Sequence, residues 1–247
     1  MIKIRETNHM EYQEGMEQID HSIMNKVLEM TDKYDYSKYT AWDVRNVLSK
    51  DSLTTEDLAV LLSPAAEPML EQMAQRAKTE TAKHFGNTVC MFTPLYIANY
   101  CENYCVYCGF NCSNKIKRGK LSMEEIEAEY KTISETGLRE ILLLTGESKT
   151  ASPVEYIADA VRLAKKYFST IGIEVYPMNS DEYALIKEAG ADFVSVYQET
   201  YNPVKYEEVH LRGAKRIFPY RFNAQERALM GGMRGCLLYT SPSPRDS

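Results

Sequence analysis

The 247-residue sequence has no long apolar run and no excess of positive charge. No stretch approaches the roughly 18 consecutive apolar residues that a membrane-spanning helix needs. The first six residues, MIKIRE, lack the apolar core of a secretory signal peptide. The net charge of −6 provides no electrostatic footprint for nucleic acid. These absences argue against membrane and nucleic-acid partners, and they predict a cytosolic protein.

Cysteine is scarce as well, because six residues are too few to cross-link a domain of this length by disulfides. The hydrophobic content of 44% and charged content of 26% are ordinary for a globular protein, which argues against disorder and against a coiled coil. Five of the six cysteines lie between Cys90 and Cys112. In a reducing compartment, clustered cysteines more often bind metal or carry out redox chemistry than form disulfides.

Residues 1–87 have the pattern of a helical N-terminal extension. Apolar side chains between Ile19 and Leu28 recur at helical spacing. Thr54, followed three residues later by Asp57, has the pattern of a helix N-cap. Nothing in these helices points to chemistry.

From residue 88 onward the pattern changes to alternating strands and helices. Strands are expected over residues 88–97, 140–145, 172–176, 192–197 and, as a fifth, 216–222. Alternation with short connections predicts parallel βαβ units. An open dinucleotide-binding sheet would have a glycine-rich turn after its first strand, where this chain has cysteines. We therefore expect the N-terminal part of a parallel (β/α) barrel over residues 88–235, with reactive groups at the carboxyl ends of its strands.

Residues 236–247 (CLLYTSPSPRDS) do not continue this pattern. They follow a glycine-rich segment, residues 231–235, where another βα unit is expected. Four or five strands make only part of a barrel and leave open sheet edges. We expect the natural sequence to end near Gly235, with the rest of the barrel missing and a non-native tail that resembles a translated sequencing adapter. A flexible natural tail is the alternative.

The chemistry is concentrated in Cys101, Cys105 and Cys108, which have the spacing C-x3-C-x2-C. Three thiolates in one loop can ligate three irons of a [4Fe–4S] cluster and leave the fourth iron open. A structural zinc site needs four ligands, and this loop contains no histidine. Cys112 is a candidate fourth thiolate, whereas Cys90 falls in the first expected strand, where a buried inert thiol is the default.

This spacing resembles the signature of the radical S-adenosylmethionine (radical SAM) superfamily. The resemblance implies two cofactors, a [4Fe–4S] cluster and S-adenosylmethionine, whose methionyl amine and carboxylate chelate the open iron. It also implies a reducing electron donor of the flavodoxin or ferredoxin type. The reduced cluster then cleaves the bound cofactor to methionine and a 5′-deoxyadenosyl radical, while the protein orients the reactants and excludes water.

The resemblance also implies cofactor-binding roles for five further residues. Tyr107 matches an aromatic residue that packs near the adenine. Gly146 and Glu147 match a Gly-Gly-Glu element, with threonine replacing its first glycine, and the carboxylate can accept from the methionyl ammonium. Glu174 matches a contact to the ribose or methionine, and Arg221 is a candidate partner for the cofactor carboxylate. The alternatives are loop packing for Tyr107, an interior acid for Glu174 and a structural role for Arg221.

Other short segments resemble the tyrosine lyases of this superfamily across about residues 50–235. They include PLYI at 94–97, CGF at 108–110 and VYQETY at 196–201. Two groups cleave tyrosine between Cα and Cβ. The 2-iminoacetate synthases of thiamine biosynthesis make dehydroglycine and p-cresol, and the [FeFe]-hydrogenase maturases carry a second cluster near the C-terminus. The segments EVYP at 174–177 and GES at 146–148 favour the first group.

Membership of that group implies tyrosine as substrate and a thiazole synthase as partner. Tyr96, Gln198 and Glu199 are candidates to line the substrate pocket, with barrel packing as the alternative. The groups that bind the substrate carboxylate are expected in the missing half, so this chain is not expected to turn over tyrosine. A non-catalytic iron–sulfur electron carrier, which usually ligates all four irons by cysteine, and a structural zinc module are the alternatives from other classes.

Overall fold

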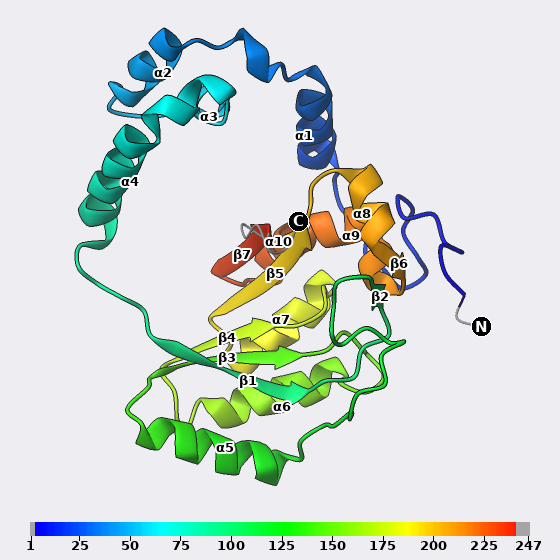
Figure 1. Cartoon of the computed structure of the whole chain (residues 1–247). Coiled ribbons are helices and arrows are strands. Elements are labelled where there is room, and N and C mark those ends of the chain that lie inside the picture. The colour runs from blue at the N-terminus through cyan, green and yellow to red at the C-terminus, as the bar shows by residue number, and fades with distance from the viewer. Residues whose placement is uncertain (1–2, 241–247) are drawn as a thin grey trace. The chain divides into compact units, whose positions relative to one another are not determined.

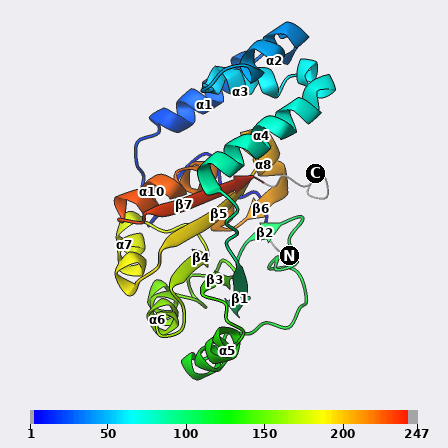
Figure 2. The ribbon, with the colours of Figure 1, turned by 90° about the vertical axis from the view of Figure 1, so that its left-hand side faces the viewer.

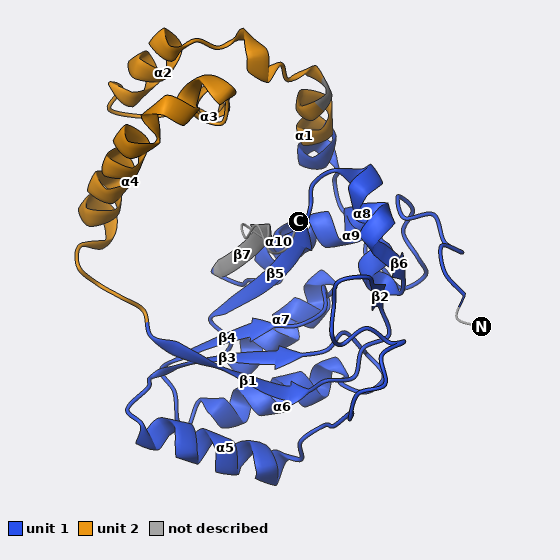
Figure 3. Ribbon diagram, in the orientation of Figure 1, with its two compact units in different colours: residues 1–25, 91–247 blue, residues 26–90 orange. Residues whose placement is uncertain are grey.

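The computed structural model describes residues 3–240, except for the side chains of Asp32 and residues 235–240. The chain divides into two compact units, one formed by Met1–Asn25 with Met91–Ser247 and the other by Lys26–Cys90 (Figure 3). This division differs from the predicted extension over residues 1–87, because the first 25 residues belong to the unit that contains the sheet.

The larger unit is built on a five-stranded parallel sheet (Figure 1). In spatial order its strands are β1 (Phe92–Ala98), β3 (Glu140–Thr145), β4 (Thr170–Glu174), β5 (Phe193–Glu199) and β7 (Gly235–Thr240). Each neighbouring pair is parallel. Since β1 and β7 form opposite edges, the sheet of the described residues is a partial barrel. The predicted parallel α/β architecture, limited to the N-terminal part of a barrel, is confirmed.

Helices α5 (Met123–Glu135), α6 (Val154–Ala164) and α7 (Ser180–Ala189) lie along one face of this sheet (Figure 2). β3 is buried on both faces, as expected of a parallel strand covered by helices. Its Ile141 and Leu143 join the core against the helices, whereas Leu144 lines a pocket on the opposite face. The sheet therefore has a helix-covered outer face and an inner face that carries a pocket.

A short antiparallel pair of strands joins two distant parts of the chain. Strand β2 (Tyr104–Cys105) lies in the cysteine-rich loop and pairs with β6 (His210–Arg212). The elements around β6 are α8 (Pro203–Val209), η3 (Ala214–Arg216), α9 (Phe218–Phe222) and α10 (Ala224–Met230). This pairing holds the cysteine-rich loop against the segment that follows β5.

The fifth strand predicted over residues 216–222 is wrong. The segment forms the end of η3 and the helix α9, with Pro219 in the first turn of that helix. Four consecutive residues, 218–221, are buried, so the apolar run resembles a buried strand in sequence although it is helical. Proline in a first helical turn is favoured because its missing N–H would be unpaired there in any case.

The smaller unit is helical, as predicted. It contains the end of α1 (Ser22–Lys33), then η1 (Tyr36–Lys38), α2 (Ala41–Leu48), α3 (Thr55–Leu61), η2 (Pro64–Met69) and α4 (Leu70–Phe85). Thr54 and Asp57 form the expected capping box at the start of α3. Val44, Val47 and Val60 are the centre of its own apolar core.

Part of the predicted tail over residues 236–247 lies outside the described residues, namely residues 241–247. The backbone of residues 236–240 pairs with β5 as part of β7. The assignment of this segment to a non-native tail stays a prediction. Within residues 3–240, no helix combines the length and apolar character that crossing a membrane requires.

Candidate active site

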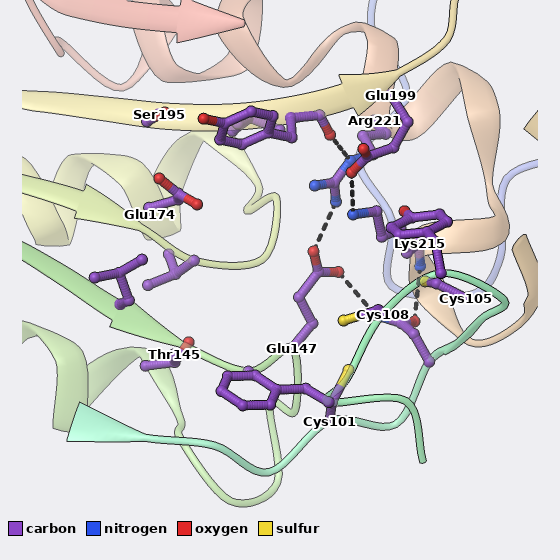
Figure 4. Close-up of a pocket in the computed structure, with 18 of the residues that line it drawn as sticks. Cys101, Cys105, Cys108, Thr145, Glu147, Glu174, Ser195, Glu199, Lys215 and Arg221 are labelled. Carbon is purple, nitrogen blue, oxygen red and sulfur yellow. Dashed lines mark hydrogen bonds and ion pairs between the residues drawn. The ribbon is translucent and has the colours of Figure 1, made fainter. Parts of the chain in front are cut away.

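A pocket lies on the inner face of the sheet, at the carboxyl ends of β1, β3, β4 and β5 (Figure 4). All the residues predicted to bind the cluster and its cofactor line it: Cys101, Cys105, Tyr107, Cys108, Gly146, Glu147, Glu174 and Arg221. Tyr96 and Glu199, two of the three predicted substrate residues, line it too. Gln198 does not line it and is fully buried.

The cysteine-rich loop connects β1 to α5 and is held by backbone hydrogen bonds. The Val106 N–H donates to the Val209 carbonyl at 3.0 Å, and the Cys112 N–H donates to the Asn103 carbonyl at 2.9 Å. Cys112 does not line the pocket. Cys90 is exposed and precedes β1, so the prediction of a buried thiol within a strand is wrong there.

The donor set of the pocket fits an iron–sulfur cluster. Among the described residues, no three His, Cys, Asp or Glu side chains converge as a single-ion site requires. A [4Fe–4S] cluster does not require its ligands to meet at one ion, because each thiolate ligates a different iron. The three sulfurs need only line the same cavity. Burial raises the pKa of the Cys101 thiol, and it raises that of Cys105 to about 12. Ligation must therefore release protons.

The carboxylate of Glu147, just after β3, is held from two sides. Nη1 of Arg221 lies 2.9 Å from its Oε1, and Nδ2 of Asn103 donates to its Oε2 at 2.9 Å (Figure 4). The Arg221 side chain is only 3% exposed and also donates from Nε to the Tyr197 carbonyl. The predicted acid and the predicted arginine thus form one buried ion pair in this structure.

Gly146 brings the end of β3 close to the cysteine-rich loop. A Cβ at this position would lie 2.2 Å from the carbonyl oxygen of Tyr100, which no side chain could tolerate. The Gly146 N–H donates to the Ala98 carbonyl at 2.9 Å. The close approach that glycine permits here is therefore an approach of two backbone segments of the protein itself.

Lys215, which the sequence analysis missed, forms a second ion pair in the pocket. Its Nζ lies 2.7 Å from Oε1 of Glu199, and both side chains are mostly buried. Burial would raise the pKa of the Glu199 carboxyl, but the charge and hydrogen bond of Lys215 outweigh it and lower that pKa. Glu199 also adopts a left-handed φ of 67°, a strained conformation that tends to occur at functional sites.

His210 is a second residue that the sequence analysis did not select. Its Nε2 lies 2.7 Å from the hydroxyl of Tyr107, although the two residues are 103 positions apart. The β2–β6 pairing brings the segment that carries His210 and Lys215 next to the cysteine-rich loop. No local spacing signal marks either residue, because neither lies beside the cysteine motif in the sequence.

Glu174 offers a test of pocket electrostatics, because burial raises the pKa of its carboxyl. The folded protein therefore keeps this proton to higher pH than the unfolded chain does, and ionisation costs stability as the pH rises through the raised pKa. We expect Glu174→Gln to stabilise the apoprotein at pH 7, because the variant has no carboxylate to ionise in the pocket. The gain should shrink as the pH falls toward about 4, where the carboxyl is largely protonated in both states.

Thermal unfolding between pH 4 and pH 8 measures this effect. The exposed Glu129, on α5, provides a matched control, and Glu129→Gln should leave the melting temperature unchanged at every pH. A Glu174→Gln variant less stable than the parent protein at pH 7 would contradict the expectation.

The family model of the Radical SAM superfamily matches residues 95–234, which is more than half of the chain and includes all the predicted site residues. The chain belongs to the radical SAM superfamily. Radical SAM proteins use a [4Fe–4S] cluster and S-adenosylmethionine, the two cofactors that the resemblance of the cysteine motif implies. The relatives that match are radical SAM enzymes, among them lyases.

Two curated relatives illustrate the range of this match. The chain is 42% identical to 2-iminoacetate synthase of Escherichia coli over 194 residues, which cover 78% of the chain and 52% of that protein. It is 32% identical to 3-methylornithine synthase of Methanosarcina barkeri, over 75% of the chain and 53% of that protein. The chain therefore spans about half the length of the curated relatives it matches.

Solved structures give the same fold. The crystal structure of HydG, a maturase of the [FeFe]-hydrogenase, matches with a TM-score of 0.80 and 29% sequence identity. That match covers 87% of this chain and 49% of the HydG chain. The partial radical SAM barrel seen here thus corresponds to about half of a longer known chain.

Proposed function

We propose that the protein is a radical SAM tyrosine lyase of the 2-iminoacetate synthase type. It would cleave tyrosine between Cα and Cβ to give 2-iminoacetate and p-cresol. The observation that supports this most strongly is the 42% identity to a 2-iminoacetate synthase over 194 residues. The pocket supports it independently, because three cysteines, two ion pairs and two candidate substrate residues share one cavity.

In this proposal the residues of the chain bind and orient the cofactors. Cys101, Cys105 and Cys108 ligate the cluster, which together with S-adenosylmethionine supplies radical chemistry when bound. Glu147 accepts from the ammonium of the cofactor, and Arg221 provides positive charge for its carboxylate. The two side chains already form an ion pair in the pocket. A negative and a positive charge are therefore in position for the ammonium and the carboxylate of the methionyl group of the cofactor.

The substrate side of the pocket includes Tyr96 and Glu199. Tyr96 packs edge-on against Phe110, which follows the last cysteine of the motif, with ring centroids 5.2 Å apart. Hydrogen transfer requires the reacting atoms to be held in contact. We therefore propose that tyrosine binds between β1 and β5, the strands that carry Tyr96 and Glu199. Gln198, which is buried away from the lining residues, is left out of it.

The proposal extends to partners and location. A reducing electron donor of the flavodoxin or ferredoxin type serves the cluster, and a thiazole synthase receives the product. Clustered thiols and an open iron–sulfur site suit a reducing cytosol.

The [FeFe]-hydrogenase maturases are the second candidate, and the structural similarity to HydG is the observation that favours them. Sequencing the source gene by long reads across codon 235 separates the two candidates. A second group of cysteines in a continued reading frame would indicate a maturase. A continued frame without such a group would support the 2-iminoacetate synthase.

The direct test is anaerobic reconstitution with iron and sulfide, followed by addition of S-adenosylmethionine, dithionite and tyrosine. We expect this chain to release methionine and 5′-deoxyadenosine, whereas p-cresol should come only from a chain that also binds the substrate carboxylate. Where the gene encodes a longer frame, its product should form p-cresol. Sustained p-cresol formation by the 247-residue chain would contradict our view of the carboxylate site, and a cluster indifferent to S-adenosylmethionine would favour an electron carrier.

A further inference from the structure

The side chain of Tyr107 is held in the pocket chiefly at its hydroxyl. Tyr107 is 49% exposed, so packing alone leaves much of its ring without neighbours. Its hydroxyl, however, lies 2.7 Å from Nε2 of His210, and the imidazole of His210 is fully buried. The two rings meet edge-on with centroids 5.6 Å apart. The hydrogen bond therefore connects a half-exposed ring to a fully buried side chain.

His210 is itself oriented by a second hydrogen bond. Its Nδ1 lies 2.8 Å from the backbone carbonyl of Tyr206, which can only accept, so Nδ1 carries the proton. With this proton on Nδ1, Nε2 is the nitrogen that accepts from the hydroxyl of Tyr107. The Tyr206 ring packs against it with centroids 3.9 Å apart.

The backbone around His210 is equally well fixed. In the β2–β6 pairing, His210 lies opposite Cys105, one of the cluster ligands. Gly213 packs so tightly on the same loop that a Cβ would lie 2.8 Å from the Cα of Asn103. The segment that carries His210 thus packs closely against the cysteine-rich loop. His210 is the residue of this segment whose side chain contacts Tyr107.

Three other groups border Tyr107. The Glu199 carboxylate and the Cys105 thiol lie beside the hydroxyl, and the carboxylate also accepts from Nζ of Lys215. The same Nζ lies 5.7 Å from the centroid of the Tyr107 ring, an attraction with little directional demand. Tyr107 has one hydroxyl proton, and the buried Nε2, at 2.7 Å, is the acceptor with no other donor in the described contacts.

We propose that His210 is a positioning residue for cofactor binding, which acts through the hydroxyl of Tyr107 to hold this ring in the orientation that S-adenosylmethionine meets. The proposal rests on the proposed function only in assuming that this pocket binds S-adenosylmethionine. It requires nothing about tyrosine as substrate. It assigns a role to a residue that is not one of the proposed cluster ligands.

A double-mutant cycle tests it with the reconstituted full chain. The variants are Tyr107→Phe, which removes only the hydroxyl, His210→Phe, their double variant, and His210→Gln, whose amide can still accept from Tyr107. Iron content is measured first, and the dissociation constant of S-adenosylmethionine is measured by calorimetry and by its effect on the electron paramagnetic resonance signal of the reduced cluster. Turnover of tyrosine is not needed for any of these measurements.

We expect iron content to stay near that of the parent protein in all four variants. Tyr107→Phe and His210→Phe should each weaken S-adenosylmethionine binding roughly three- to tenfold, the effect of losing one ordinary hydrogen bond. The double variant should be no weaker than either single variant, because both remove the same contact. His210→Gln should restore most of the affinity.

Several results would overturn the proposal. Tyr107→Phe with unchanged affinity would do so even if His210→Phe failed to fold, and so would additive losses in the double variant. Loss of the cluster in His210→Phe and His210→Gln alike would assign His210 a purely structural role. A parent protein that binds no S-adenosylmethionine would remove both this inference and the proposed function. The product of a longer reading frame that binds S-adenosylmethionine without forming p-cresol would remove only the proposed function.

Discussion

Replacement of Cys101, Cys105 or Cys108 by alanine is expected to abolish assembly of the iron–sulfur cluster. All three cysteines line one pocket. If these three thiolates ligate the cluster, each loss would leave a second iron without a protein ligand. The reconstituted parent protein should be brown and should bleach in air, and each variant should be nearly colourless. Iron and sulfide analysis, together with the visible absorption spectrum, measures the effect.

Two other cysteines in the same part of the chain provide matched controls. Cys112 lies in the same loop without lining the pocket, and Cys90 is exposed before β1. Cys112→Ala and Cys90→Ala should therefore keep the full iron content. Loss of the cluster in Cys112→Ala would identify a fourth thiolate and would favour an electron carrier, and a cluster retained in Cys105→Ala would refute the assigned ligand set.

Replacement of Arg221 by methionine is expected to lower the free energy of unfolding by about 3–5 kcal/mol, the usual cost of removing one partner from a buried ion pair. Methionine occupies similar space but donates no hydrogen bonds. The Glu147 carboxylate, with its side chain 14% exposed, would lose its cation, and the Tyr197 carbonyl would lose the donation from Nε. Urea unfolding of the apoprotein, monitored by circular dichroism, measures the change without any cofactor.

The exposed ion pair between Arg162 and Asp159 on α6 provides the control. The side chains of these residues are 49% and 58% exposed, so Arg162→Met should change stability by no more than about 0.5 kcal/mol. Adding Glu147→Gln to Arg221→Met should recover part of the loss, because no unpaired charge then remains buried. Equal effects of Arg221→Met and Arg162→Met would show that the buried pair contributes no more than a surface pair.

Much of the architecture could be predicted because its signals are local. The strand over residues 140–145 was predicted at its observed bounds, since a short apolar run between helices indicates a buried parallel strand. The same argument predicted a strand over residues 216–222, where the structure has a helix. A helix that is buried on all sides and a buried strand show the same apolar pattern in sequence. The exposure of Cys90 was missed because the strand begins at Phe92, four residues later than predicted.

The sequence by itself determined the parallel α/β architecture, and it predicted the three cysteine ligands and the edge of the sheet at which the candidate site lies. The three cysteines lie within eight residues of one another, so a local motif reveals them. In a parallel sheet the carboxyl ends of the strands meet at one edge, so the order of strands and helices predicts where the site lies. Only the tertiary structure decided which side chains partner the site. Arg221 reaches Glu147 across 74 positions, and His210 reaches Tyr107 across 103. Such contacts arise from strand pairing and helix packing between distant segments, and no local pattern of residues encodes them.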